Sequence, residues 1–230
     1  MTRTLARQAT AELIGTAFLV AAVVGSGIAA TQLFPGEVGL QLLTNSVVTG
    51  AALVALILAL QPVSASFNPV VTLVEHFLGK ISPRTAVTLI TGQLAGGAVG
   101  VVAANLMFDL DAISWATTER DGAGVWLGEL VATFGLVLIV FGSLRSARPE
   151  VVAFAVGGYI AAAYWFTSST SFANPAVTAA RMVSDSFAGI DPRSAPAFVA
   201  VQLAGGVLGL AAVQFLFPKQ PDPERRPDTA

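Results

Sequence analysis

Two segments of this chain are near copies of each other, and both interrupt sequence that is otherwise strongly apolar. Residues 64–74 read SASFNPVVTLV, and residues 170–180 read TSFANPAVTAA. Each centres on an Asn-Pro pair and the residue after it, and the two sets are Asn68, Pro69 and Val70, and Asn174, Pro175 and Ala176. A polar, helix-starting signal at membrane depth is tolerated only where it is buried in protein or faces a water-filled cavity. We therefore expect the two segments to line a pore.

The composition restricts the class of protein. Of the 230 residues, 54% are hydrophobic and 11% are charged, whereas a typical soluble domain is about 25% charged. An integral membrane protein is therefore expected. The net charge of −2 and the scattered basic residues give no reason to expect a nucleic-acid partner. With no cysteine and one histidine, His76, we expect neither a metal site nor a cofactor. The sequence contains no nucleophile–base pair or phosphate-binding loop that would indicate an enzyme.

Six apolar stretches are long enough to cross a membrane, which takes roughly 20 residues in a helix. They cover residues 10–30, 40–61, 83–107, 125–144, 150–167 and 195–217. Each Asn-Pro pair lies between two of these stretches, in segments 63–79 and 168–188, which are too short to cross the membrane twice. We predict a re-entrant half-helix at each, and hence an all-α membrane protein with six transmembrane helices plus two half-helices.

The chain contains an internal duplication. Three pairs of residues recur in the same order: Glu12 with Glu129, Asn68 with Asn174, and Gln93 with Gln202. Because each half has three spans, an odd number, the second half must cross in the opposite direction, which makes an inverted repeat. We expect a single channel domain over residues 1–217, with repeats at about 8–107 and 125–217, followed by a flexible cytoplasmic tail at 218–230.

The duplicated glutamates lie inside apolar spans, where a charged group is costly and usually functional. Because Glu12 and Glu129 recur at equivalent places, we expect them to support structure by accepting hydrogen bonds from N–H groups of the re-entrant loops. A proton relay is the alternative.

Lysine and arginine residues predict the orientation. With six spans, one side carries nine of them: Arg3, Arg7, Lys80, Arg84, Arg145, Arg148, Lys219, Arg225 and Arg226. The other side carries three: Arg120, Arg181 and Arg193. Because cytoplasmic loops are enriched in lysine and arginine, we predict that both termini are cytoplasmic.

Each Asn-Pro pair predicts the start of a helix. An asparagine side-chain oxygen caps early backbone N–H groups, and proline suits the first turn because it has no N–H and a fixed φ. If the half-helices enter from opposite sides, both starts meet near the midplane with their side-chain NH₂ groups free to donate to a solute. Two helix N-termini would make this point electropositive, which opposes cations and protons but not neutral molecules.

Both Asn-Pro boxes, the glutamate pair and the glutamine pair together make residues 8–217 resemble the aquaporin and aquaglyceroporin (major intrinsic protein) family. The resemblance implies six tilted helices, two half-helices, one pore per chain and a homotetramer in the lipid bilayer. The first box departs mildly from the family pattern, with Val70 in place of alanine.

The surroundings of the second box depart further. The family usually has an arginine directly after Asn-Pro-Ala, where it forms one wall of a narrow selectivity filter, and this chain has Val177 there. Counting from the boxes places the other filter positions at Ser171, at Ala162, and at Val48 or Thr49. None is charged or aromatic, so we predict a wide, weakly polar filter. This pattern resembles the bacterial aquaglyceroporins linked to arsenic resistance, which implies a bacterial inner (plasma) membrane.

Two neighbouring features are open to more than one interpretation. Arg181 shares a helix face with Val177 at i+4. We expect it at the pore mouth or between helices, the alternative being that it reaches back to the lumen. The run 164–166, Tyr-Trp-Phe, is expected to form part of an interfacial aromatic belt.

The predicted function is a passive channel for water and small neutral solutes, including glycerol and metalloid hydroxides such as arsenous acid (arsenite). One alternative is a general glycerol and water channel with no role in arsenic transport. A second is a proton-coupled secondary transporter, which would have to use Glu12 and Glu129 as its titratable groups. A third is a non-conducting adhesion or scaffold protein with the same fold.

Overall fold

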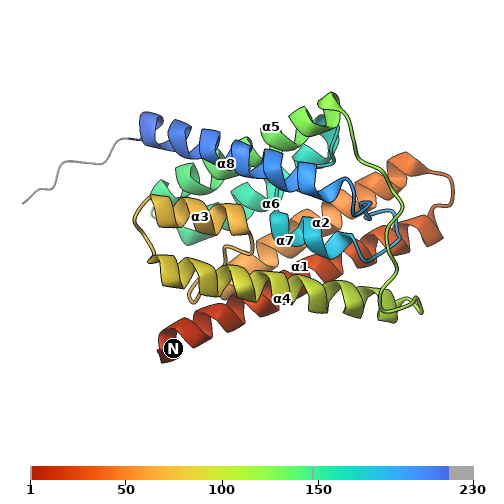
Figure 1. Cartoon of the computed structure of the whole chain (residues 1–230), viewed down its shortest axis with the longest axis horizontal. Helices are drawn as coiled ribbons and strands as arrows, with labels where there is room; N and C mark the ends of the chain where they lie inside the picture. The colour runs from red at the N-terminus through yellow and green to blue at the C-terminus, as the bar shows by residue number, and fades with distance from the viewer. Residues whose placement is uncertain (1, 147, 218–230) are drawn as a thin grey trace, which may run out of the picture.

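The computed structural model describes residues 2–146 and 148–217, and this part of the chain is helical without strands (Figure 1). Its elements are α1 (Arg3–Leu33), α2 (Val38–Leu60), α3 (Pro69–Phe77), α4 (Pro83–Met107), α5 (Ala123–Ser143), the short 3₁₀ helix η1 (Leu144–Ser146), α6 (Pro149–Phe166), α7 (Pro175–Arg181) and α8 (Ala195–Leu216). The predicted tail at 218–230, with three of the basic residues used to predict the orientation, lies outside the described residues.

Six of these helices coincide with the six predicted spans. By length and composition, α1, α2, α4, α5 and α8 are able to cross a membrane, and α6 contributes a shorter apolar helix at Glu150–Phe166. The other two, α3 and α7, have 9 and 7 residues and begin at the Asn-Pro segments. The predicted fold class, six transmembrane helices plus two half-helices, is confirmed.

Each half-helix begins at its proline, with the preceding asparagine as the cap. Asn68 is extended, and its side-chain oxygen accepts the Val70 N–H at 2.9 Å. Asn174 is also extended, and it accepts the N–H groups of Ala176 at 3.0 Å and Val177 at 3.3 Å. Side-chain oxygens thus satisfy N–H groups that have no partner within the first turn.

The two halves repeat the same packing. In the first half α1 packs along α4, and in the second α5 packs along α8. Figure 1 shows α3 and α7 between these two pairs. Glycines allow the backbones to approach at both crossings: a Cβ on Gly96 would collide with the Leu13 carbonyl oxygen, and a Cβ on the equivalent Gly205 would lie 2.7 Å from the Leu130 carbonyl oxygen.

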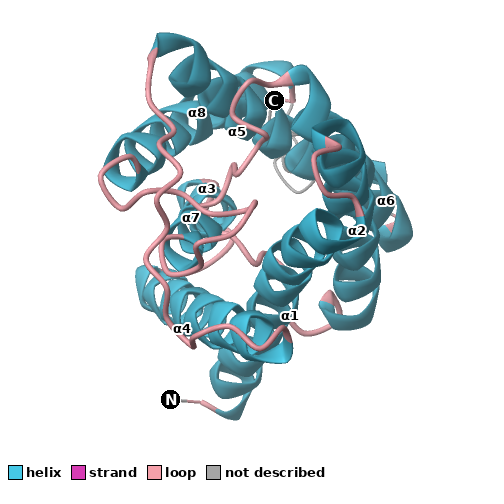
Figure 2. Cartoon of the chain, turned by 90° about the vertical axis from the view of Figure 1, so that its right-hand side faces the viewer, coloured by secondary structure: helices cyan, strands magenta, loops and turns pink. Residues whose placement is uncertain are grey.

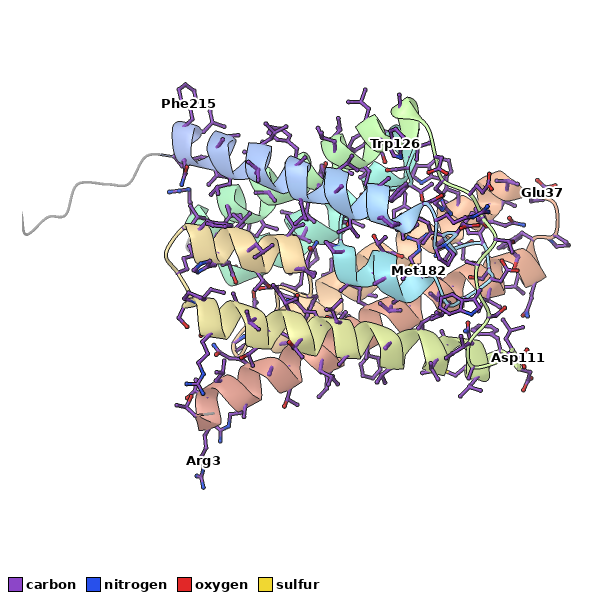
Figure 3. The ribbon with its side chains drawn as sticks, viewed as in Figure 1. Arg3, Glu37, Asp111, Trp126, Met182 and Phe215 are labelled. Carbon is purple, nitrogen blue, oxygen red and sulfur yellow. The ribbon has the colours of Figure 1, made fainter. Side chains whose placement is uncertain are left out.

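The ends of the long helices and the centre of the bundle are arranged as an inverted repeat requires. In Figure 3, Arg3 and Phe215 lie at one end of the helices, whereas Glu37 and Asp111 lie at the other. The start of α1 and the end of α8 therefore share a side. In Figure 2 the loops leading into α3 and α7 lie near the centre of the molecule, surrounded by the longer helices. The fold thus brings the two Asn-Pro segments together inside the bundle.

The Gly96 contact makes a testable prediction. Because a methyl group there must push α1 away from α4, we expect Gly96→Ala to lower the free energy of unfolding by about 1–3 kcal/mol. Denaturation followed by circular dichroism in detergent measures this. Gly158→Ala in α6 is the matched control, since beyond its chain neighbours and the backbone of its own helical turns no described atom lies within 4 Å of the added Cβ. It should be neutral or stabilise by roughly 0.5–1 kcal/mol. Equal effects of the two substitutions would contradict the proposed crossing.

Candidate functional site

The two Asn-Pro segments line a cavity of about 80 Å³ in the centre of the bundle, which is large enough to hold water. Its apolar wall comes from α1, α2, α5 and α6. On each of these helices the lining residues are four apart, as in Thr49, Leu53 and Ile57 of α2, because that spacing keeps side chains on one helix face. The opposite wall is formed by the loops before α3 and α7, by the first turns of these two helices and by Arg181 at the end of α7. The polar lining residues are Thr49, Ser66, Asn68, Tyr164, Ser171, Asn174 and Arg181.

The two asparagines hold each other's loops. The amide nitrogen of Asn68 donates to the carbonyl oxygen of Ala173 at 2.7 Å, and that of Asn174 donates to the carbonyl oxygen of Phe67 at 2.7 Å. One of the two N–H donors of each amide is therefore used by the protein, where the sequence suggested that the whole NH₂ group would be free. The second N–H remains for the cavity, because a primary amide has two donors.

The residues before the asparagines adopt the left-handed conformation. Phe67 has φ 48° and Ala173 has φ 47°, values that are uncommon for residues other than glycine. Together they turn the chain so that each carbonyl faces the amide of the other half. Such local strain persists only where the surrounding structure fixes it, and here two buried carboxylates do so.

Glu12 fixes the first loop from α1. It is fully buried, and its carboxylate accepts the backbone N–H groups of Ser66 at 2.9 Å and Phe67 at 2.7 Å. Gln93 of α4 donates to the same carboxylate at 2.8 Å and to the hydroxyl of Thr72 at 2.8 Å. The carboxylate thereby connects α1, α4 and α3 to the loop that carries Asn68.

Glu129 repeats this arrangement in the second half. Its carboxylate accepts the N–H of Phe172 at 3.2 Å and also the N–H of Ala173. Gln202 of α8 donates to it at 2.8 Å and to the hydroxyl of Thr178 at 2.8 Å. Both glutamates therefore have the loop N–H contacts expected of structural support.

The residues at and after the prolines pack away from the cavity. Val70 lies against Gly206 of α8, where an added Cβ would come within 2.5 Å of it, and the carbonyl of Ala176 lies against Gly97 of α4. Pro69 and Pro175 occupy the first turns of their helices. These four members of the boxes position the asparagines, which alone among the six line the cavity.

The predicted filter positions divide into two groups. Thr49, Ser171 and Val177 line the cavity. The hydroxyl of Ser171 has no hydrogen-bond partner among the described residues. Val48, at 37% exposure, and Ala162 are exposed and do not line it. Of the two candidates on α2, Thr49 is therefore the one that lines the cavity.

Tyr164 stands where Ala162 was expected. The α6 residues facing the cavity are Val152, Val156, Ile160 and Tyr164. Ala162 is two residues from this row, so it faces away. The hydroxyl of Tyr164 lies 3.2 Å from that of Thr49. Trp165 and Phe166 are exposed, as an interfacial belt requires, but Tyr164 is buried and does not belong to it. Counting every fourth residue from Val152 would have placed Tyr164, and not Ala162, on this face of the helix.

Arg181 also differs from its predicted place. It is 2% exposed, lines the cavity, and its guanidinium carbon lies 3.3 Å from the centre of the Phe172 ring. The predicted filter residues that line the cavity, Thr49, Ser171 and Val177, are neither charged nor aromatic, but Arg181 adds a charge to the wall, which was the alternative position considered for it. The sequence signal was the i+4 spacing from Val177, which places both side chains on the same face of α7.

The loops at this end of the cavity are held together by a second arginine and an ion pair. Arg120 donates to the carbonyl oxygens of Gly189 at 2.9 Å and Phe187 at 3.4 Å. Arg193 donates to Asp191 at 2.7 Å, and these bonds lower the pKa of Asp191 to about 2. The Asp191 carboxylate therefore stays charged over the physiological pH range.

Comparisons with known proteins agree with this geometry. A family model described as Major intrinsic protein matches residues 1–151. The chain is 44% identical over 230 positions to aquaglyceroporin AqpS of Rhizobium meliloti (strain 1021), an alignment that covers 97% of this chain and 98% of that protein. It is 29% identical over 250 positions to the probable aquaporin AqpM of Archaeoglobus fulgidus, covering 94% and 98% of the two chains.

A solved structure shares the fold. The X-ray structure of the aquaglyceroporin from Plasmodium falciparum superposes with a TM-score of 0.71, covering 92% of this chain and 95% of that one at 19% identity. At this identity the similarity speaks for the fold alone.

The glutamate contacts lead to a second prediction. In Glu12→Gln an NH₂ group must face backbone N–H donors, so we expect the free energy of unfolding to fall by about 1–3 kcal/mol and solute flux to slow as the Asn68 loop shifts. Denaturation in mixed micelles and stopped-flow light scattering measure the two effects. The control is Glu150→Gln, which removes an exposed ion pair with Arg148 and should cost at most about 0.5 kcal/mol. Wild-type stability in Glu12→Gln would contradict the assigned role.

Proposed function

The chain belongs to the major intrinsic protein family, and from this premise we propose that it forms a passive channel for water and small neutral hydroxylated solutes, glycerol and arsenous acid among them. It is an integral, multi-pass membrane protein of the aquaporin fold, and its relatives are channels, which are not enzymes. The observation that carries the proposal is the meeting of Asn68 and Asn174 at one central cavity.

The cavity suits a solute that hydrogen-bonds on one side only. The half-helix loops supply the remaining amide N–H groups of both asparagines and the hydroxyl of Ser171, while the facing wall is mainly aliphatic. A neutral hydroxylated molecule exchanges part of its hydration for these donors and acceptors. A cation loses hydration and meets two helix N-termini with positive partial charge, so its passage is unfavourable.

The side chains near Val177 support passage of solutes larger than water. Valine is shorter than arginine and has no hydrogen-bond donors, while Thr49 and Ser171 are small and carry hydroxyls. Glycerol and arsenous acid are both neutral and both present hydroxyl groups. We propose that they share this route, with Thr49, Ser171 and Val177 as selectivity positions. The relative at 44% identity is named an aquaglyceroporin, which favours glycerol as a solute.

We also propose the orientation, the membrane and the assembly of the channel. The greater number of lysines and arginines on the side of the termini supports a cytoplasmic placement of both ends. The bacterial relative supports an inner (plasma) membrane. The family resemblance supports a homotetramer with one pore in each chain, which crosslinking in membranes followed by electrophoresis would test.

A filter substitution tests the proposed solutes. Because an arginine at 177 would project from the cavity-lining face of α7, we expect Val177→Arg to slow glycerol and arsenous acid at least about tenfold while water still passes. Stopped-flow light scattering of proteoliposomes measures water and glycerol, and arsenic uptake is measured by elemental analysis.

The control for this test is Val177→Met, which adds length without charge or donors and should slow the larger solutes less. Unchanged glycerol and arsenous acid fluxes in Val177→Arg would remove Val177 from the selectivity positions. A wild-type channel that passes glycerol but not arsenous acid would support the general glycerol and water channel.

A gradient test separates the channel from a coupled transporter. The glutamates that a proton-coupled mechanism needs are occupied by loop N–H groups and glutamine donors. We therefore expect glycerol equilibration in proteoliposomes to proceed at the same rate with or without an imposed pH or sodium gradient. Accumulation of glycerol beyond equilibrium under either gradient would favour the transporter.

A further inference from the structure

Arg181 lies outside the two Asn-Pro boxes, yet it places a positive charge at the cavity that they line. Asn174, Val177 and Arg181 all line the cavity, and their spacing of three and four residues puts them on one face of α7. The chain therefore has an uncharged side chain directly after the second box and an arginine one turn further along.

The Arg181 side chain is held rigidly by its neighbours. Its Nε donates to the carbonyl oxygen of Ala188, and its guanidinium lies over the Phe172 ring. Phe172 is itself packed edge-on against Phe198, with ring centres 5.1 Å apart. A guanidinium stacked on an aromatic face is attracted by the negative face of the ring. The side chain is therefore fixed in position without a carboxylate.

No carboxylate is in contact with the guanidinium of Arg181 within the described residues, and the buried Glu129 acts on it only from beyond ion-pair distance. The ion pairs formed among residues 2–146 and 148–217 do not include it. The Phe172 ring is also contacted by a second cation, Arg120, whose guanidinium carbon lies 5.0 Å from the ring centre. Because arginine stays protonated in proteins, this end of the cavity carries a positive charge.

Most of the donors of Arg181 are also unused. A guanidinium has five N–H donors, and the Nε bond to Ala188 is its one hydrogen bond within the described part of the chain. The terminal amino groups belong to a side chain that lines the cavity. They are available to the oxygen atoms of a solute that enters it.

The other half of the molecule shows that the fold itself does not require this arginine. The residue at the equivalent distance from Asn68 is Glu75, which accepts a hydrogen bond from the hydroxyl of Ser66 at 3.1 Å and does not line the cavity. Val71 and Val177 are equivalent in the same way, and both line it. Both halves therefore have a valine three residues after the asparagine, but seven residues after it one half has a glutamate and the other an arginine.

We infer that Arg181 is a specificity-determining residue of the pore: its fixed positive charge repels cations, and its free N–H groups bind the oxygens of passing neutral solutes. This inference rests on the proposed channel function. In this proposal, solute size and cation exclusion depend on two different residues that lie one helical turn apart. Val177 leaves the pore open to larger solutes, and Arg181 keeps the electrostatic barrier against cations.

The test compares cation leak and neutral flux in the same proteoliposomes. Arg181→Gln removes the charge while keeping a polar side chain. We expect potassium and proton leak under an imposed membrane potential to rise at least about tenfold, with glycerol still passing. Arg181→Lys keeps the charge and should stay close to wild type in cation leak. Fluorescent potential-sensitive and pH-sensitive dyes report the leak, and stopped-flow light scattering reports glycerol.

The matched control is Arg120→Gln, which removes the second cation from Phe172 and a loop contact but does not alter a cavity-lining residue. It should leave cation leak within about twofold of wild type. If Arg181→Gln passes glycerol and remains as tight to cations as wild type, the inference is overturned. The same holds if Arg120→Gln leaks equally, since the effect would then be due to loosened loops.

Arg181→Met covers the case in which Arg181→Gln fails to fold: it removes the charge but keeps an unbranched side chain that can lie on the apolar Phe172 ring, and we expect it to leak cations more than wild type. A further variant restores the charge at a second position. The double change Val177→Arg with Arg181→Gln returns the charge to the position after the box. It should exclude cations like wild type and pass glycerol more slowly. A double variant that is helical but leaks cations would overturn the inference. Failure of wild type to pass any neutral solute would instead reject the channel proposal itself, so the two failures are distinguishable.

Discussion

The two buried carboxylates, Glu12 and Glu129, are the constraint on which the rest of the pore depends. A loop that leaves helical structure at membrane depth exposes backbone N–H groups, and no lipid atom can accept from them. Each glutamate accepts two such groups from one loop and is held in turn by a glutamine from a neighbouring helix. Charge burial is costly on its own, but several hydrogen bonds to the charged form offset that cost.

Once the loops are fixed, the asparagines can serve two purposes. Asn68 and Asn174 cap their own half-helices with the side-chain oxygen and join the two halves with one amide N–H each. The left-handed turns at Phe67 and Ala173 aim the accepting carbonyls. What remains for a solute is a short row of polar groups on one wall opposite an aliphatic wall. This arrangement favours neutral molecules because full rehydration of an ion is impossible there.

The charged residues break the symmetry of the repeat. Glu75 and Arg181 stand at equivalent distances from their asparagines, yet only Arg181 lines the cavity. The two ends of the pore therefore differ electrostatically although their backbones are alike. The aromatic ring of Phe172 contributes to this difference, since it contacts the guanidinium of Arg181, a residue that is 2% exposed and forms no ion pair within the described residues.

The sequence by itself determined the six spans, the half-helices, the inverted repeat and the glutamate positions, because hydrophobic length, Asn-Pro caps and duplicated residues are local signals. The tertiary structure decided which side chains face the cavity. Thr49 rather than Val48, and Tyr164 rather than Ala162, line it because helix rotation depends on packing against other helices, as at Gly50, where a Cβ would lie 2.8 Å from the Gly157 carbonyl oxygen. Arg181 enters the pore because Phe172 and Ala188, brought together by folding, hold it there.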